Sequence, residues 1–192
     1  MRIIAGSKRG MKLLMPRTST SRPITDRVKE SVFSVLYKYD LPDGGVVADV
    51  FAGVGSLGLE ALSRGAEFVT FVENDPKVAS ILRKNIEKGS FSASSKVVKA
   101  NAFKVGAPVG PEWEKYDLVF VDPPYARSRD ASARSGLGGL LALLCEQVKE
   151  NGVVVVRTER YVELLDAYER LKVIERREWG TMAVTILQLV RR

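Results

Sequence analysis

The chain has 192 residues, of which 45% are hydrophobic and 28% are charged, and its formal net charge is +7. This composition is ordinary for a globular protein with one main core. No apolar run approaches the roughly eighteen residues that cross a membrane, and residues 1–10 lack the apolar centre of a secretory signal, so we expect a cytoplasmic protein. The single cysteine, Cys145, excludes an intrachain disulfide bond.

The chain contains no histidine. This absence excludes Ser-His-Asp and Cys-His nucleophilic catalysis and the common histidine-bound zinc sites. Carboxylates, lysines, tyrosines and backbone groups remain for any chemistry, and a cofactor that carries the reactive group fits this set better. We therefore expect a cofactor-dependent activity that requires no metal.

The positive charge is concentrated at the start of the chain. Residues 1–39 contain nine lysines and arginines against two acidic residues, and this surplus equals the net charge of the whole chain. A basic end on an otherwise balanced body favours contact with a polyanion, and a merely solvated basic surface is the alternative. The candidate phosphate-binding residues are Arg2, Lys8, Arg9, Lys12, Arg17, Arg22 and Arg27.

The first residues alternate between short apolar runs and polar loops. Residues 2–5 and 11–15 flank a basic loop with two glycines, which predicts a β-hairpin. Residues 17–23 are polar and end in a proline, which predicts an extended connector. We expect this hairpin, with the helix that follows it, to form a basic appendage over residues 1–39 on a main domain of residues 40–192.

An amphipathic helix is predicted after the connector. Thr25 is a suitable N-cap, apolar residues recur behind it at helical spacing, and Pro42 marks the end of the pattern. Arg27 and Lys29 lie off the apolar stripe. The apolar face of this helix is therefore expected to lie against the main domain.

The rest of the chain alternates between strands and helices, which predicts a parallel sheet with right-handed crossovers. Strands are expected at residues 46–51, 68–72, 96–99, 117–121, 153–157, 172–178 and 184–190. Helices are expected from the turn 53–58 to residue 62 and at residues 76–88, 137–148 and 161–171. The last two strands are joined by a short turn and must be antiparallel. The predicted fold class is α/β, a Rossmann-like, mostly parallel sheet of seven strands with an antiparallel last strand.

The sequence Asp122-Pro123-Pro124-Tyr125 follows a β-branched and aromatic run. Neither proline has an N–H to donate, so the strand ends there, and a carboxylate, a rigid carbonyl and an aromatic ring meet at the C-terminal edge of the sheet. Ligands bind at that edge in open α/β sheets. We expect a catalytic motif, with a stiff turn around a packed tyrosine as the alternative. Residues 126–136 have no hydrophobic period and predict either a functional lid or a disordered loop.

A glycine-rich turn follows the first strand. Gly53-Val-Gly55-Ser-Leu-Gly58 matches the G-x-G-x-x-G pattern of dinucleotide-binding proteins, and Glu73 ends the next strand. Asp49, however, places a negative charge where a pyrophosphate would lie. S-adenosylmethionine (SAM) carries a sulfonium, an amino group and a ribose diol that Glu73 can bind, so the two carboxylates favour SAM over NAD. A plain glycine turn for tight packing is the alternative.

Several segments together resemble one protein family. Residues 49–66, with Glu73 and residues 122–125, resemble the class I SAM-dependent methyltransferases. Residues 1–10 and 22–30 resemble, more narrowly, the bacterial 16S ribosomal RNA guanine-N2 methyltransferases of the RsmD type. The similarity covers nearly the whole chain. It implies methylation of guanine 966 of 16S rRNA, on small-subunit assembly material rather than on a free nucleoside.

The resemblance implies roles for the site residues in transfer of the SAM methyl group to the exocyclic N2 of guanine. Asp122 and Pro123 would accept the N–H bonds of that amine, and Tyr125 would stack on the base. The catalytic residues would be Asp122, Pro123, Pro124 and Tyr125. The cofactor-binding residues would be Asp49, Phe51, Ala52, Gly53, Gly55, Leu57, Glu73, Asn74, Asn101, Ala102 and Asp122. The chain departs from the family at Asn101, where an acidic residue is usual, and at Glu159, to which we assign no role.

Two other functions stay open at this point. The Asp-Pro-Pro-Tyr motif serves exocyclic amines generally, so N6-adenine methylation of DNA is one of them. The second is an rRNA-binding assembly factor without turnover, against which the intact Asp49, Glu73 and Asp122 argue. We expect a monomer with SAM as its cofactor and 16S rRNA as its partner.

Overall fold

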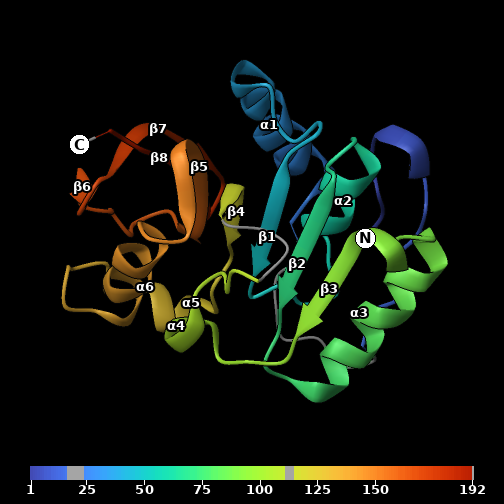
Figure 1. The fold of residues 1–192 in the computed structure, drawn as a ribbon. Helices are drawn as coiled ribbons and strands as arrows, with labels where there is room; N and C mark the ends of the chain where they lie inside the picture. Colours follow the sequence, from blue (N-terminus) through green and yellow to red (C-terminus); the bar gives the residue numbers. More distant parts are fainter. Residues whose placement is uncertain (17–23, 111–114, 192) are drawn as a thin grey trace.

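The computed structural model describes residues 1–16, 24–110 and 115–191. These residues form one eight-stranded sheet in the order β3-β2-β1-β4-β5-β8-β7-β6 (Figure 1). The strands are β1 (Val46–Val50), β2 (Phe68–Val72), β3 (Ser95–Val98), β4 (Tyr116–Val121), β5 (Val148–Glu159), β6 (Ala167–Tyr168), β7 (Leu171–Trp179) and β8 (Met182–Leu189). The helices are η1 (Gly6–Lys8), α1 (Asp26–Leu36), η2 (Tyr37–Tyr39), α2 (Gly58–Ser63), α3 (Pro76–Gly89), η3 (Ser92–Ser94), α4 (Ala102–Val105), α5 (Tyr125–Ser128) and α6 (Gly136–Leu144).

The strands β1 to β5 pair in parallel, and β8 pairs antiparallel with β5. This arrangement confirms the predicted α/β class, and the short β6 adds one strand to the seven expected. The strand order reverses between β1 and β4. In such sheets the crossovers leave this point in opposite directions, and a crevice opens at the carboxyl ends of the two strands.

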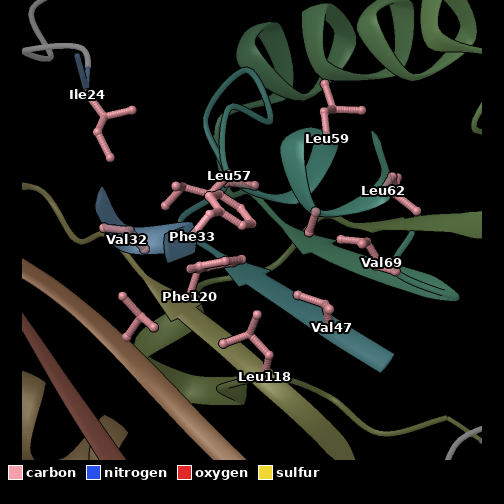
Figure 2. Close-up of a cluster of buried hydrophobic side chains, with 14 of the residues drawn as sticks. Ile24, Val32, Phe33, Val47, Leu57, Leu59, Leu62, Val69, Leu118 and Phe120 are labelled. Atoms are coloured by element: carbon pink, nitrogen blue, oxygen red, sulfur yellow. The ribbon is translucent and has the colours of Figure 1, made fainter. Parts of the chain in front are cut away.

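Both faces of the sheet are covered, which explains why its central strands are apolar along their whole length. Alternate side chains of a strand point to opposite faces. On one face Val47 and Phe120 pack with Phe33 of α1 (Figure 2). On the other face Ala48 and Val121 belong to a second cluster together with α6. The sheet is therefore a rigid platform for the residues at its carboxyl edge.

The N-terminal segment, residues 1–16, lies against the first of these faces. The predicted hairpin is reduced to a single antiparallel bridge between Arg2 and Lys12, with η1 in the loop. The side chains of Ile3 and Leu13 are buried in the same cluster as α1 and α2. The segment thus contributes to the core of the sheet rather than lying only on its surface.

The helix α1 begins where the sequence predicted, because the Thr25 Oγ1 accepts the N–H of Val28 at 3.3 Å. It ends at Leu36 and continues into η2. Arg27 is exposed, but the expectation that Lys29 lies off the buried face is wrong, since its side chain is 0% exposed. Lys29 is buried because a carboxylate of another helix lies beside it, as described below.

Two predicted helices differ from the structure. The helix expected at residues 137–148 ends at Leu144, because Val148 already belongs to β5 and pairs with Tyr116. Residues 161–171 form turns, the short β6 and the first residue of β7 instead of a helix. The Tyr168 hydroxyl donates to the carbonyl of Ala131, and this buried contact holds the segment extended. No helix within the described ranges is long and apolar enough to cross a membrane.

Candidate active site

The carboxyl edge of the sheet opens into a cleft of about 950 Å³. The cleft is lined from the ends of β1, β2, β4 and β5 and from the loop after β3. Every predicted catalytic residue lines it, as does every predicted cofactor-binding residue except Gly55. Residues separated by more than seventy positions in the sequence thus meet at one site, as expected from the strand ends.

The glycine-rich turn at the end of β1 is held in left-handed backbone conformations. Phe51, Gly53 and Gly55 have φ values of 64°, 56° and 89°. A Cβ at Gly55 would lie 2.6 Å from Leu82, whereas one at Gly53 would have no heavy atom within 4 Å. Gly55 therefore packs tightly inside and Gly53 borders open space. A bulky residue such as Phe51 in this region is strained, and such strain is typical of ligand sites.

Asp49 stabilises the end of this turn through a buried hydrogen bond. Its side chain is 2% exposed, and its Oδ2 accepts the N–H of Gly58, the first residue of α2, at 2.8 Å. Burial raises the pKa of Asp49 well above its usual range, the Gly58 bond opposes this rise, and Asp122 and Glu73 add to it. A cation bound nearby would favour the ionised form of this carboxylate.

Glu73, at the end of β2, is oriented by two backbone donors. Its Oε2 accepts the N–H of Gly53 at 2.9 Å and its Oε1 accepts the N–H of Asp75 at 2.8 Å. Asp75 in turn caps α3 by accepting the N–H of Lys77 at 2.7 Å, as predicted. Each carboxylate oxygen of Glu73 has a second lone pair, so the residue can accept two hydroxyl groups from a diol in the cleft.

Two aromatic side chains line the cleft, Phe51 beside the glycine-rich turn and Phe103 of α4. The rings of Phe51 and Phe103 lie 4.8 Å apart, and the guanidinium of Arg127 lies 5.2 Å from the Phe103 ring. Asn101 caps α4 by accepting the N–H of Phe103 at 3.1 Å. The Asn101 side chain is therefore fixed at the cleft although it is not acidic.

Asp122 is paired with an arginine that the sequence did not point out. The Nε of Arg157, near the end of β5, donates to Asp122 Oδ1 at 2.6 Å. Burial raises the pKa of Asp122, and the Arg157 charge opposes that rise. The Arg157 guanidinium also lies 5.9 Å from the ring centroid of Tyr125. The four residues after β4 and the end of β5 thus form one catalytic candidate cluster.

Glu159, for which the sequence indicated no role, also lines the cleft. Its Oε2 accepts from Arg129 Nε at 3.2 Å and from the Tyr161 hydroxyl at 2.7 Å. The loop at residues 126–136 includes most of the helix α5. The ion pair between Arg129 and Glu159 connects this loop to β5.

Comparison with known proteins agrees with this geometry. The family model described as "Conserved hypothetical protein 95" matches residues 1–188. Ribosomal RNA small subunit methyltransferase D of Haemophilus influenzae is 39% identical over 163 residues, which cover 83% of this chain and 79% of the relative. The chain belongs to the RsmD-type methyltransferase family. The solved structure of the Escherichia coli protein yhhF superposes on this RsmD-type chain with a TM-score of 0.82 and 31% identity, covering 100% of this chain and 99% of that chain.

The fold of this RsmD-type protein is that of SAM-dependent methyltransferases. An RNA methyltransferase from Salinibacter ruber, solved with S-adenosyl-L-homocysteine, has the same fold at a TM-score of 0.63 and 14% identity, over 89% of this chain and 95% of that chain. SAM is the cofactor of this methyltransferase. The cleft suits it, since Glu73 offers two acceptors, Gly53 borders open space, and the Ser56 hydroxyl is buried without a partner among the described residues. The described residues contain no cluster that would hold a metal ion.

The candidate phosphate-binding residues of the N-terminal part, as far as the structure describes them, do not line the cleft of this RsmD-type chain. Arg9, Lys12 and Arg27 are exposed, Arg2 is exposed and pairs with Asp26, and Lys8 is half-buried. None of them lines the cleft, but Met1, Met15, Pro16 and Ile24 of the same part of the chain do. Arg17 and Arg22 fall outside the described residues.

A buried carboxylate, Glu60 of α2, fastens the N-terminal segment to the sheet. It accepts the N–H groups of Ile4 at 2.8 Å and Ala5 at 3.0 Å. It also pairs with Arg64 at 2.9 Å and with Lys29 at 3.4 Å, and both Lys29 and Glu60 have side chains that are 0% exposed. The sequence does not reveal this network, because no local pattern distinguishes a buried glutamate from a solvated one.

Asn85 of α3 makes a second connection to the N-terminal segment. Its Oδ1 accepts the N–H of Leu14 at 2.7 Å, and its Nδ2 donates to the carbonyl of the same residue at 3.1 Å. Nδ2 also donates to the carbonyl of Val54, inside the glycine-rich turn, at 3.0 Å. One buried amide therefore joins the N-terminal segment to the loop at the cofactor cleft.

We expect SAM to bind at one site per chain, and the change Glu73→Gln to weaken binding about ten- to a hundredfold. Loss of one charge-assisted hydrogen bond has about that effect. Calorimetric titration measures it, and Glu67→Gln, at the opposite end of β2, is the matched control with unchanged affinity. Binding of NAD in preference to SAM would contradict the assignment.

Proposed function

We propose that this protein transfers the methyl group of SAM to the exocyclic N2 of a guanine in 16S rRNA, on small-subunit assembly material. We assign this guanine to position 966, on the basis of the resemblance to the RsmD-type family. The observation that carries the proposal is the Asp122 carboxylate at the end of β4, in the cofactor cleft and beside Pro123 and Tyr125. The name of the Haemophilus influenzae relative, a small-subunit rRNA methyltransferase, supports the substrate class.

The side chains of this cleft suit an amine substrate. SAM supplies a methyl group that a sulfonium makes electrophilic. The guanine amine is a weak nucleophile because its lone pair is delocalised into the ring, and accepting its N–H bonds localises that pair. We assign this role to Asp122 Oδ2 and the Pro123 carbonyl, and we assign stacking on the base to Tyr125. As the new N–C bond formed, the bond from the methyl carbon to the SAM sulfur would break, and S-adenosylhomocysteine would leave as a neutral thioether. The amine would then carry a positive charge and lose a proton, which an ionised Asp122 can accept.

Alignment supplies much of the remaining rate enhancement. Holding two reactants in reactive geometry lowers a barrier by roughly 7–11 kcal/mol. We assign binding of the cofactor to Glu73 and the glycine-rich turn. We assign binding of the base to the residues at the end of β4. Both groups sit on a sheet that is buried on its two faces, so their separation is fixed by rigid elements.

The basic N-terminal part supports an RNA substrate. We propose that residues 1–39 contact RNA, through Arg2, Lys8, Arg9, Lys12, Arg17, Arg22 and Arg27, next to the methyltransferase domain of residues 40–192. In support, the same stretch provides four residues of the cleft wall, so RNA held there has its bases near the cofactor. Phosphate contacts of this kind position the substrate without reading its sequence.

Changing Arg9, Lys12 and Arg22 together to Ala is expected to weaken RNA binding and to flatten its salt dependence. Each neutralised phosphate contributes about −0.7 to −0.9 to the slope of log K against log salt, so the slope should fall by about two to three units. RNA affinity measured over a salt series tests this. The matched control is Lys149, Lys172 and Arg191 changed to Ala, at the opposite edge of the sheet, where the slope should stay unchanged.

The proposed activity is tested with RNA from cells that lack the protein. Transfer of a tritiated methyl group from SAM, followed by nucleoside analysis, should give N2-methylguanosine. A parallel reaction with DNA that gave labelled N6-methyladenine would favour adenine methylation instead. Binding of RNA without transfer would indicate an assembly factor.

A further inference from the structure

The end of β5 places one cation directly on the proposed catalytic carboxylate. Arg157 Nε and Asp122 Oδ1 are 2.6 Å apart, and the two side chains are 11% and 20% exposed. Such a distance is short even for a charge-assisted hydrogen bond. A contact of this kind between partly buried groups has more effect on the carboxylate than an ion pair on the surface would.

The surroundings of this pair are rich in negative charge. The charged residues that line the cleft together with Asp122 are Asp49 of β1, Glu73 and Asp75 after β2, Arg127 of α5, and Arg157 and Glu159 of β5. Arg127 lies against the Phe103 ring, and Glu159 pairs with Arg129. Among the described residues that line the cleft, Arg157 is thus the cation in contact with Asp122.

Burial favours the neutral form of an aspartate, and it is the cause that raises the pKa of Asp122. A neutral Asp122 would present a hydroxyl hydrogen to the substrate amine, where the reaction requires a second acceptor and a group that can take a proton. The reaction therefore requires the ionised form of Asp122, and the guanidinium of Arg157 stabilises this form. Arg suits this task because its charge persists and its planar donors fix the plane of the carboxylate.

We propose that Arg157 is a positioning residue for methyl transfer, which holds Asp122 ionised and turned so that its second oxygen meets the substrate amine. The inference rests on the proposed function of Asp122. The stacking residue is part of the same arrangement, because the Arg157 guanidinium lies 5.9 Å from the Tyr125 ring. Arg157 therefore fixes the position of the Asp122 carboxylate relative to the Tyr125 ring.

The sign of the pH effect follows from this arrangement. Activity requires ionised Asp122, so the rate falls as the pH drops through the pKa of that carboxyl. Burial raises this pKa and Arg157 opposes the rise. Loss of Arg157 therefore raises the pKa further, and the acid limb of the rate profile moves to higher pH.

Two variants separate the charge of Arg157 from its shape. Arg157→Met keeps the length and apolar stem, and it should raise the pKa of Asp122 by about one to two units. Arg157→Lys keeps the charge without the planar fork, so its shift should be smaller and of the same sign. The matched control is Arg160→Met, an exposed arginine three residues further along that pairs with Glu178 and does not line the cleft.

The experiment combines two measurements on the full chain. Carbon NMR of labelled aspartate carboxyls gives the pKa of Asp122 without RNA or turnover, and kcat measured against pH gives the acid limb. We expect both to move together, with the KM for SAM unchanged and with Arg160→Met equal to wild type. An unchanged pKa in folded Arg157→Met, or a shifted pKa with an unmoved acid limb, would overturn the inference.

Failure of the proposed function appears differently. A wild-type protein that methylates no RNA would overturn the role of Asp122 in catalysis, and the positioning role of Arg157 with it, whatever the NMR titration shows. If Arg157→Met does not fold, Arg157→Lys carries the test. Its smaller shift in both measurements supports the inference, and no shift in either overturns it.

Discussion

Methyl transfer by the Asp122→Asn variant is expected to be about 10²- to 10⁴-fold slower than by wild type, with SAM affinity within a few fold of normal. Asparagine keeps the size of the side chain, but it removes the charge that pairs with Arg157 and the base that accepts the amine proton. General-base groups contribute rate effects of about this size. Single-turnover methylation of RNA measures the rate, and calorimetry measures SAM binding.

The opposite end of the same strand offers the control for this variant. Asp117, at the start of β4, accepts the N–H of Val46 at 2.9 Å and pairs with Lys149, far from the cleft. Asp117→Asn should leave the rate of methylation unchanged. Near-normal turnover by Asp122→Asn would show that another group activates the amine.

Removal of Glu60 is expected to give the largest loss of stability. The variant Glu60→Ala leaves Lys29 buried and charged, and it leaves the N–H groups of Ile4 and Ala5 without their acceptor. Removal of one member of a buried ion pair costs about 3–5 kcal/mol, a large part of the total stability of a domain. For a chain of this size we expect the melting temperature to fall by about 6–20 °C.

A matched variant distinguishes loss of the buried network from the effect of replacing any glutamate in a helix. Glu87→Ala changes an exposed glutamate of α3 and should melt within about 2 °C of wild type, because surface substitutions have small effects. Glu60→Gln keeps an acceptor for a backbone N–H and should lie between the two. If Glu60→Ala melted like Glu87→Ala, the buried network would not stabilise the fold.

The sequence predicted the parts of the fold that depend on local patterns. The β-branched runs at β1, β2 and β4, the caps Thr25 and Asp75, and the antiparallel end of the sheet were all found where expected. The cleft followed from the same patterns, because parallel strands bring their carboxyl ends to one edge. Strand ends that carry Asp49, Glu73 and Asp122 had to meet there.

Other features depend on partners that are distant in the sequence. Arg157 is 35 residues from Asp122, and Lys29 is 31 residues from Glu60, so no periodicity shows that either cation is paired. The segment 161–171 has apolar residues at helical spacing, yet the buried contact of Tyr168 with Ala131 decides its conformation. Tertiary contacts override local propensity in such segments.

The hydrogen bonds of the Asn85 amide limit how the RNA target of such an enzyme can change during evolution. It holds Leu14 on one side and Val54 on the other, so the stretch that we propose for RNA and the turn at the cofactor share one buried hydrogen-bond network. Ile4, Ala5 and Leu14 make these bonds through backbone groups, so a replacement of residues 1–16 that changed the backbone path would remove partners from both Asn85 and Glu60 in an apolar interior. Exchanges of exposed side chains leave these bonds intact, and they are the changes by which the proposed RNA contacts of the segment can vary while the fold is kept.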